Sequence, residues 1–260
     1  IVVSRVGLRG SIRALFVLLA FWFVLLDRER TMGLIARAML ERSRGSSSMW
    51  GPVLWNRPWV IAAGAALGAA CAVKWSGAYI LAVLGIYLVV TDALARRRAG
   101  ITLWPTDAAF RQGPVTFVLF VPVAFVVYLA SWTGWLVTAG GYDRQSDPNP
   151  FIALWNYHTA IYNFHVGLTS EHAYASPAWQ WPLMLRPTSM YWNNVAYETD
   201  GCDLPSGCVQ AVTSIANPAI WYAGVVAVLI LIAIFAIRPL RGRFRDWRIA
   251  LVLTAIGATY

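Results

Sequence analysis

Long apolar runs constrain this chain more than any other feature of its sequence. Runs of about 15 to 25 apolar residues have the length with which an α-helix crosses a bilayer. A helix is expected for each run, because a helix satisfies its own backbone hydrogen bonds in lipid. With 58% hydrophobic and 13% charged residues, the chain is predicted to be an all-α, polytopic membrane protein.

About six transmembrane helices are predicted. From Trp59 to Val90 the sequence is apolar for 32 residues, which is too long for one straight span, and Lys74-Trp75-Ser76-Gly77 interrupts it near the middle. We therefore expect two short helices that turn at Lys74. The six predicted spans cover residues 12–26, 58–73, 76–91, 114–137, 217–237 and 247–260.

The basic residues predict the orientation of these spans. If the spans alternate in direction, loops 27–57, 92–113 and 238–248 lie on one side and hold 15 of the 21 basic residues. Basic loops of membrane proteins face the cytoplasm, so the remaining long loop is predicted to be extracytoplasmic and the net charge of +9 does not indicate a nucleic-acid partner. The predicted regions are 1–138 with about four spans, the extracytoplasmic loop 139–216, and the C-terminal transmembrane region 217–260.

The loop 139–216 is predicted to contain an amphipathic helix that carries every histidine of the chain. Asn149 is a typical helix cap, and Pro150 suits the first helical position because its missing N–H costs nothing there. His158, His165 and His172 are spaced by seven residues and share one helix face. Apolar residues lie beside them at helical spacing, so an interfacial helix with imidazoles on its buried stripe is expected.

Two interpretations of the histidines stay open. Seven residues span about 10 Å along a helix, whereas metal–nitrogen bonds are about 2 Å long, so a shared metal site is rejected. The imidazoles either line a polar substrate pocket or are buried against aromatic residues and bonded to backbone carbonyls.

Aromatic residues and prolines follow the histidines and surround Arg186. Trp and Tyr are ordinary at a membrane interface, but flat aromatic faces also stack on sugar rings, and an arginine at headgroup depth is a partner for a phosphate. Lys74 is either a second phosphate ligand or a snorkelling lysine. The aromatic residues include Tyr174, Trp179, Trp181, Tyr191 and Trp192.

Two cysteines lie in a loop rich in Gly, Pro and Asp. Cys202 and Cys208 are expected to form a disulfide if that loop faces an oxidising compartment, and to remain thiols otherwise. No GxSxG, HExxH, P-loop or GxGxxG motif is present in the sequence.

The order of residues around the histidines resembles the protein O-mannosyltransferases of the bacterial type. The loop matches that signature at Tyr157-His158, Tyr162, Phe164-His165, Leu168-Thr169, His172, Tyr174, Ser176-Pro177, Trp179, Trp181-Pro182-Leu183, Arg186-Pro187 and Tyr191-Trp192. Supporting matches are Ser4-Arg5, Asp27-Arg28-Glu29-Arg30, Lys74-Trp75 and Asn217-Pro218-Ala219-Ile220-Trp221. The resemblance covers nearly the whole chain.

This resemblance implies part of a C-type glycosyltransferase fold and an inverting transfer of mannose from polyprenyl-phosphate-mannose to Ser or Thr hydroxyls of exported proteins. The lipid-linked donor is a co-substrate, no cofactor is certain, and the cell membrane and the Sec translocon are the implied surroundings. Arg5, Lys74 and Arg186 are the candidate ligands of the donor phosphate. His158, His165, His172, Tyr174, Trp179 and Trp181 are the candidates for the sugar or acceptor pocket.

Two features depart from the family. Its acidic pair, whose aspartate serves as the base, lies in a first external loop that would precede Ile1, so the chain is expected to be a fragment that is inactive alone. Where the family continues from Ser-Arg into Leu-Asp and an apolar segment, this chain has Leu8-Arg9-Gly10-Ser11-Ile12-Arg13.

Two other classes of function stay open. A related transferase would use the same kind of lipid donor with another sugar or acceptor. A noncatalytic membrane scaffold or a transporter would be expected to carry ionisable residues inside its spans, where Lys74 and the pair Arg9 and Arg13 are nearly the only ones predicted.

Overall fold

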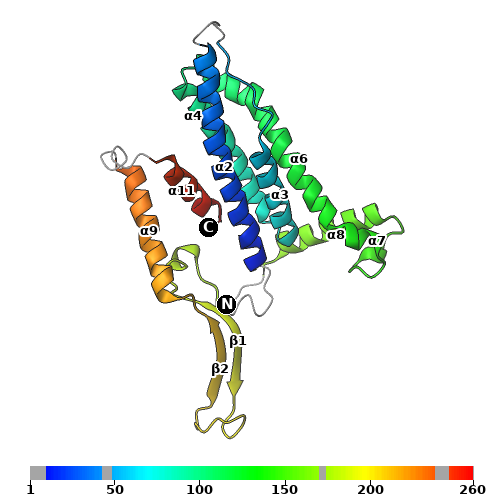
Figure 1. The fold of residues 1–260 in the computed structure, drawn as a ribbon. Coiled ribbons are helices and arrows are strands. Elements are labelled where there is room, and N and C mark those ends of the chain that lie inside the picture. Colours follow the sequence, from blue (N-terminus) through cyan, green and yellow to red (C-terminus); the bar gives the residue numbers. More distant parts are fainter. Residues whose placement is uncertain (1–9, 43–48, 170–173, 238–245, 260) are drawn as a thin grey trace. The chain divides into compact units, whose positions relative to one another are not determined.

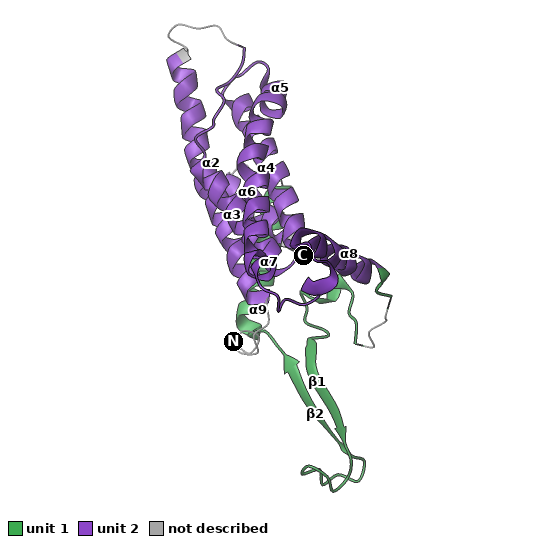
Figure 2. Cartoon of the chain, turned by 90° about the vertical axis from the view of Figure 1, so that its right-hand side faces the viewer, with its two compact units in different colours: residues 1–8, 167–246, 260 green, residues 9–166, 247–259 purple. Residues whose placement is uncertain are grey.

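The computed structural model describes residues 10–42, 49–169, 174–237 and 246–259. The candidate residues Arg5 and His172 lie outside the described residues. Two compact units make up the chain, one of residues 9–166 and 247–259 and the other of residues 1–8, 167–246 and 260 (Figure 2). These units divide the chain differently from the three predicted regions, because the histidine helix groups with the helices that precede it.

The larger unit is helical throughout its regular structure (Figure 1). Its long helices are α2 (Gly10–Arg42), α3 (Pro58–Val73), α4 (Gly77–Arg98), α6 (Gly113–Ser131), α8 (Pro150–Gly167, whose last residue begins the other unit) and α11 (Trp247–Thr259). Short helical segments connect them: α5 (Trp104–Thr106), the π-helical η1 (Asp107–Gln112), α7 (Thr133–Val137) and η2 (Arg144–Ser146). The smaller unit contains η3 (Ala178–Gln180), β1 (Thr188–Val195), β2 (Cys208–Ser214) and α9 (Pro218–Ala236).

Four described helices are long and apolar enough to cross a membrane: Gly10–Glu41, Gly77–Arg98, Trp104–Ser131 and Pro218–Ala236. Two shorter apolar helices, Pro58–Val73 and Trp247–Gly257, lie where the other two spans are predicted. The prediction of a mainly helical, polytopic chain is therefore confirmed, including the turn at Lys74 between α3 and α4.

Two helices continue beyond the predicted spans, and a third ends before its predicted span does. α2 continues past residue 26 to Arg42, and α4 continues past residue 91 to Arg98. α6 ends at Ser131, and Trp132 separates it from α7. Hydrophobicity marks where a helix can contact lipid, and it does not mark where the helix ends, because a helix continues into water when its polar residues have partners.

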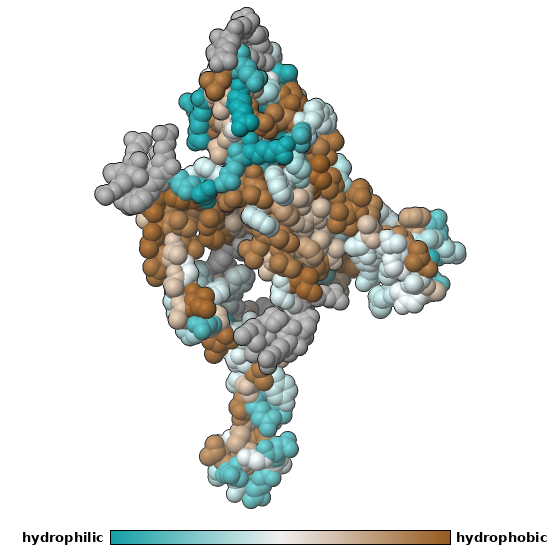
Figure 3. All heavy atoms as spheres, viewed as in Figure 1, coloured by the Kyte–Doolittle hydropathy of each residue, from teal (hydrophilic) through white to brown (hydrophobic). Residues whose placement is uncertain are grey.

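α3 lies between α2 and α6 and packs against both (Figure 1). Gly64 and Gly68 let the α3 backbone approach α6 closely, since a Cβ on Gly68 would lie 2.3 Å from the carbonyl oxygen of Ala124. This is the small-xxx-small packing of membrane helices. Large apolar side chains remain exposed along these helices, as expected of a surface that faces lipid, and Figure 3 shows the apolar side chains that cover much of the visible face.

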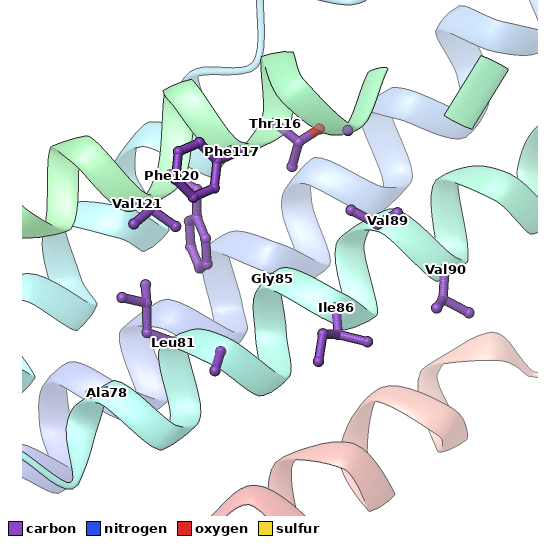
Figure 4. A pocket seen from close by; sticks show the side chains of 12 residues that line it. Ala78, Leu81, Gly85, Ile86, Val89, Val90, Thr116, Phe117, Phe120 and Val121 are labelled. Atoms are coloured by element: carbon purple, nitrogen blue, oxygen red, sulfur yellow. The ribbon is translucent and has the colours of Figure 1, made fainter. Parts of the chain in front are cut away.

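An apolar groove with a volume of about 550 Å³ lies between α4 and α6 (Figure 4). It extends along α4 from Ala78 to Val90, and Phe117, Phe120 and Val121 contribute its α6 wall. Its polar lining side chain, Thr116, already accepts a hydrogen bond from Arg57.

The smaller unit contains a β-hairpin that the all-helical prediction missed. β1 and β2 pair antiparallel, with an irregularity between Ser189 and Tyr191. The disulfide Cys202–Cys208 joins the connection between the strands to the first residue of β2, with a Cα–Cα distance of 5.7 Å. Alternating apolar residues and a turn-rich connection are hairpin signals, but the aromatic residues of β1 are equally typical of a membrane interface.

Candidate functional site

α8 begins as its sequence predicts. The Asn149 side chain accepts a hydrogen bond from the Phe151 N–H at 2.9 Å, and Pro150 is the first helical residue. Ala153 and Leu154 are buried, whereas Tyr157 and His158 on the same face are half-buried. This stripe fixes the first half of α8 on the larger unit.

His158 is held at both ring nitrogens. Its Nδ1 lies 2.8 Å from the carbonyl oxygen of Leu154, which only accepts hydrogen bonds, so Nδ1 carries the proton. Nε2 then accepts from the Tyr128 hydroxyl at 2.6 Å. The Tyr128 oxygen accepts in turn from the Trp75 indole N–H at 3.0 Å. A directed chain of hydrogen bonds therefore joins the turn after α3, the end of α6 and α8.

Aromatic rings surround the hydrogen-bonded side chains of Trp75, Tyr128 and His158. The Trp132 ring centroid lies 4.9 Å from that of His158, and the Trp75 ring stacks on the His158 ring with the centroids 5.5 Å apart. Trp132 also contacts Tyr157 edge-on at 5.9 Å. His158 thus has the surroundings of a histidine packed against aromatic residues and bonded to a backbone carbonyl.

The second half of α8 differs from the expected buried stripe. His165 is exposed, although its Nδ1 also bonds a backbone carbonyl, that of Ile161, at 2.8 Å. The larger apolar side chains around it are exposed as well, including Phe164 at 64% and Tyr162 at 59%. His158 and His165 lie on one face of α8, as their heptad spacing predicts. Of these two, only His158 packs against other helices.

The turn between α3 and α4 presents Lys74. Its side chain is exposed and has no hydrogen-bond or ion-pair partner among the described residues. The Lys74 carbonyl accepts from the Gly77 N–H at 3.0 Å, and the Trp75 carbonyl accepts from the Ala78 N–H at 2.9 Å. Gly77 is required here, because a Cβ would lie 2.8 Å from the backbone nitrogen of Cys71.

Arg13 of α2 reaches the same turn and donates to the Ser76 hydroxyl. In the sequence, Arg13 was noted as a departure from the family pattern and as an ionisable residue within a span. The structure gives it a local partner, and the position is therefore compatible with the fold.

The smaller unit brings Arg186 and Tyr174 together. The Arg186 Nη1 donates to the Ala175 carbonyl at 2.8 Å, and its guanidinium lies 5.4 Å from the centre of the Tyr174 ring. Trp181 donates from its indole N–H to the Ser176 hydroxyl at 3.2 Å. Arg186 and Trp181 therefore both close onto residues 174–176.

α9 forms two hydrogen bonds to the loop that contains Arg186. The Trp221 indole N–H donates to the Pro182 carbonyl at 2.8 Å, and the Tyr222 hydroxyl donates to the Leu183 carbonyl at 3.1 Å. Asn217 caps α9 by accepting from the Ala219 and Ile220 N–H groups, as its place before Pro218 predicts. Trp179 is 63% exposed beside the anchored residues.

The predicted site residues are thus grouped within each unit. Lys74 lies next to Trp75, whose hydrogen-bond chain ends at His158, in the larger unit. Arg186, Tyr174 and Trp181 form a second group in the smaller unit.

A buried ionic cluster in the larger unit was missed by the sequence analysis. Asp27 and Arg28 of α2, Arg57 before α3 and Asp92 of α4 are at most 3% exposed. Arg57 pairs with Asp27 at 2.5 Å and with Asp92 at 2.6 Å, and Arg28 pairs with Asp92 at 2.5 Å. Burial alone lowers the pKa of Arg57, but the carboxylates of Asp92 and Asp27 outweigh it and raise that pKa above its ordinary value.

A second buried ionic contact continues along α4. Arg96 pairs with Asp107 of η1 at 2.7 Å and donates to the Pro52 carbonyl at 2.8 Å. Gln112 holds the same loop, accepting from the Leu54 N–H at 2.8 Å and donating to the Leu54 carbonyl at 3.1 Å.

These contacts correct the reading of the basic loops. Arg28, Arg57 and Arg96 are buried in ion pairs. These three arginines were counted among the charges of a cytoplasmic surface, but they instead stabilise contacts between helices. The isolated aspartates among many arginines were the available signal, because a carboxylate at the end of a membrane helix needs a partner. The cluster also places more ionisable groups within helices than the predicted spans contained.

Comparison with known proteins identifies relatives of this chain. Residues 150–250 match the family model described as the C-terminal four TMM region of protein-O-mannosyltransferase. A polyprenol-phosphate-mannose--protein mannosyltransferase of Mycolicibacterium smegmatis is 32% identical over 279 residues, covering 99% of this chain and 51% of the relative. The proteins of the same name from Mycobacterium tuberculosis and Corynebacterium glutamicum are 30% and 26% identical, covering 97% and 93% of this chain and 49% of each relative.

The chain spans about half the length of the curated relatives it matches. No solved structure matches it significantly. The resemblance found in the sequence is confirmed by these relatives, and the apolar helices together with the matched transmembrane region show that the chain is a membrane protein.

Proposed function

We propose that this chain forms part of an inverting protein mannosyltransferase, which transfers mannose from polyprenyl-phosphate-mannose to Ser or Thr hydroxyls of exported proteins. The similarity to relatives of that name over 97 to 99% of the chain carries this proposal. In the reaction the acceptor oxygen bonds to C1 of mannose, the C1–O bond to the lipid phosphate breaks, and the hydroxyl proton passes to a base. That base is expected on a segment preceding Ile1.

Arg186 is the proposed ligand of the leaving phosphate in the smaller unit. Only one of its N–H donors has a hydrogen-bond partner among the described residues, the Ala175 carbonyl. Tyr174 and that carbonyl fix the guanidinium plane, so its remaining donors are free to bind two phosphate oxygens as a fork. A fixed cation stabilises the charge that grows on the leaving group.

Lys74 is the proposed second cation, and Arg5 the third. The exposed Lys74 ammonium has the freedom to bind a phosphate as a point charge. The apolar groove between α4 and α6 begins at Ala78, four residues after Lys74, and is the proposed path of the polyprenyl chain.

The sugar or acceptor pocket is proposed to include Tyr174, Trp179 and Trp181, whose exposed rings suit stacking on a sugar. His158 is proposed to shape this pocket through the aromatic rings packed around it, because both of its nitrogens are already bonded and Trp75 stacks on its ring. His165 is exposed and His172 completes the proposed set.

The proposed location is the cell membrane, with residues 139–216 on the extracytoplasmic side, where exported acceptors emerge and the Sec translocon is a candidate neighbour. The arginine-rich loops support this orientation. Ser146→Cys should react with a membrane-impermeant thiol reagent from outside, and Thr102→Cys only after the membrane is opened. The reverse labelling pattern would contradict the orientation.

The activity is tested with an enzyme of the relatives' full length that contains these residues. Purified protein should transfer mannose from polyprenyl-phosphate-mannose to a Ser/Thr peptide, and the product should be the α-anomer if the donor is β-linked. Transfer of another sugar from the same lipid in preference to mannose would replace this proposal with the related transferase. No transfer from any lipid-linked donor would favour a noncatalytic role.

A further inference from the structure

The exposed Lys74 lies in a turn that is fixed from two sides by polar side chains. Lys74 itself is extended and continues neither helix. The two residues that follow it are both bonded to other elements: Trp75 to Tyr128 of α6, and Ser76 to Arg13 of α2. The backbone of this turn is therefore fixed, whereas the Lys74 side chain is free to change its rotamer.

The bonds of Trp75 are directional. Tyr128 accepts from the indole N–H and donates to Nε2 of His158, whose other nitrogen is committed to the Leu154 carbonyl. Each member of the chain uses its donor once, so the Tyr128 hydroxyl has one satisfied orientation. Its removal would release the Trp75 indole while leaving the Tyr128 ring in place.

Helix packing alone does not require these polar contacts. Gly77 already sets the close approach of α4 to the end of α3. The hydrogen bonds of Trp75 and Ser76 act on the two residues next to Lys74, and at a half-exposed edge of the bundle they add little to burial. Their geometric effect is to fix the direction in which the Lys74 side chain leaves the turn.

We propose that Tyr128 and Arg13 are positioning residues for Lys74, holding its turn in the orientation that binds the phosphate of the lipid donor. This inference rests on the proposed function. Tyr128 acts through Trp75 and touches neither the sugar nor the phosphate. Preorganising a charged group in this way lowers the cost of binding, because less freedom is lost when the ligand arrives.

The test is a double-mutant cycle in the full-length enzyme with Tyr128→Phe, Lys74→Ala and the double variant. The readouts are KM for polyprenyl-phosphate-mannose and kcat, normalised to folded protein. Tyr128→Phe should raise the donor KM about tenfold, a coupling within the range for residues that act on a shared partner. Because Tyr128 acts through Lys74, the double variant should be no worse than Lys74→Ala.

Tyr142→Phe is the matched control. Tyr142 contacts the ring of Tyr157, which precedes His158 in α8, is 80% exposed, and its hydroxyl has no hydrogen bond among the described residues. It should leave the donor KM unchanged. If Tyr128→Phe lowers the yield of folded protein, Trp75→Phe removes the same hydrogen bond from the other side and serves instead.

The outcomes separate this inference from the proposed function. Multiplicative losses in the double variant would show that Tyr128 acts independently of Lys74 and would overturn the inference, with the transferase proposal intact. Normal donor KM in Tyr128→Phe or in Lys74→Ala would also overturn it. Absence of mannose transfer by the unmodified enzyme would reject the proposed function itself.

Discussion

Asp92→Asn is expected to destabilise the larger unit severely. The carboxylate is 1% exposed and accepts from Arg28 at 2.5 Å and from Arg57 at 2.6 Å. Asn has nearly the same volume, so the substitution changes charge and donor pattern and leaves the packing almost unchanged. One of its two oxygens becomes an NH2 group that faces an arginine.

The magnitude follows from the charge balance of the cluster. Asp27 and Asp92 balance Arg28 and Arg57 in a group of side chains that is at most 3% exposed. Removing one carboxylate leaves an uncompensated buried positive charge, which costs about 3–5 kcal/mol of the free energy of unfolding. Removal of Arg28 as well, by Arg28→Gln, restores neutrality and should recover part of that loss.

Glu29→Gln is the matched control. Glu29 pairs with Arg248 at 2.6 Å, a distance like those in the cluster, but the two side chains are 43% and 54% exposed. An exposed pair contributes at most about 1 kcal/mol. The two substitutions make the same chemical change and differ in burial.

The assay is unfolding of the purified protein in mild detergent, with denaturant titration where it is reversible and inactivation half-life at fixed temperature where it is not. Equal losses for Asp92→Asn and Glu29→Gln would refute the assignment of a buried, energetically coupled cluster. So would a double variant no more stable than Asp92→Asn alone.

Three further predictions concern packing, redox state and catalysis. Gly68→Ala should lower the free energy of unfolding by about 1–3 kcal/mol, because its Cβ would meet the α6 backbone. Gly33→Ala, with open space around it, should leave that free energy unchanged or raise it. Equal effects of the two substitutions would contradict the close approach of the helices. Cys202 and Cys208 should resist alkylation until a reductant is added, and prompt alkylation would exclude the disulfide. Arg186→Ala should cost about 2–4 kcal/mol of transition-state stabilisation in mannose transfer, and Arg186→Lys should also be impaired because it loses the fork; wild-type transfer by the alanine variant would reject the phosphate role.

Several local features of this protein could be predicted from the sequence. The apolar runs give the helices, and Asn149 and Asn217 start α8 and α9, because each signal depends on residues within a few positions. The interruption at Lys74 marked the turn between α3 and α4 for the same reason. The order of residues in the loop was sufficient to suggest the relatives that comparison then found.

Only the tertiary structure decided which charged and polar side chains meet. Arg57 and Asp27 are 30 positions apart, Arg28 and Asp92 are 64 apart, and Trp75 and Tyr128 are 53 apart. Hydropathy and charge counts treat each of these residues as a surface group, because an arginine in a basic loop looks the same whether it faces water or a buried carboxylate. The β-hairpin was missed for a related reason, since its strands are defined by pairing with each other. Local residues therefore determine where helices form, and contacts between distant residues determine which charges are buried and which remain free to bind a ligand.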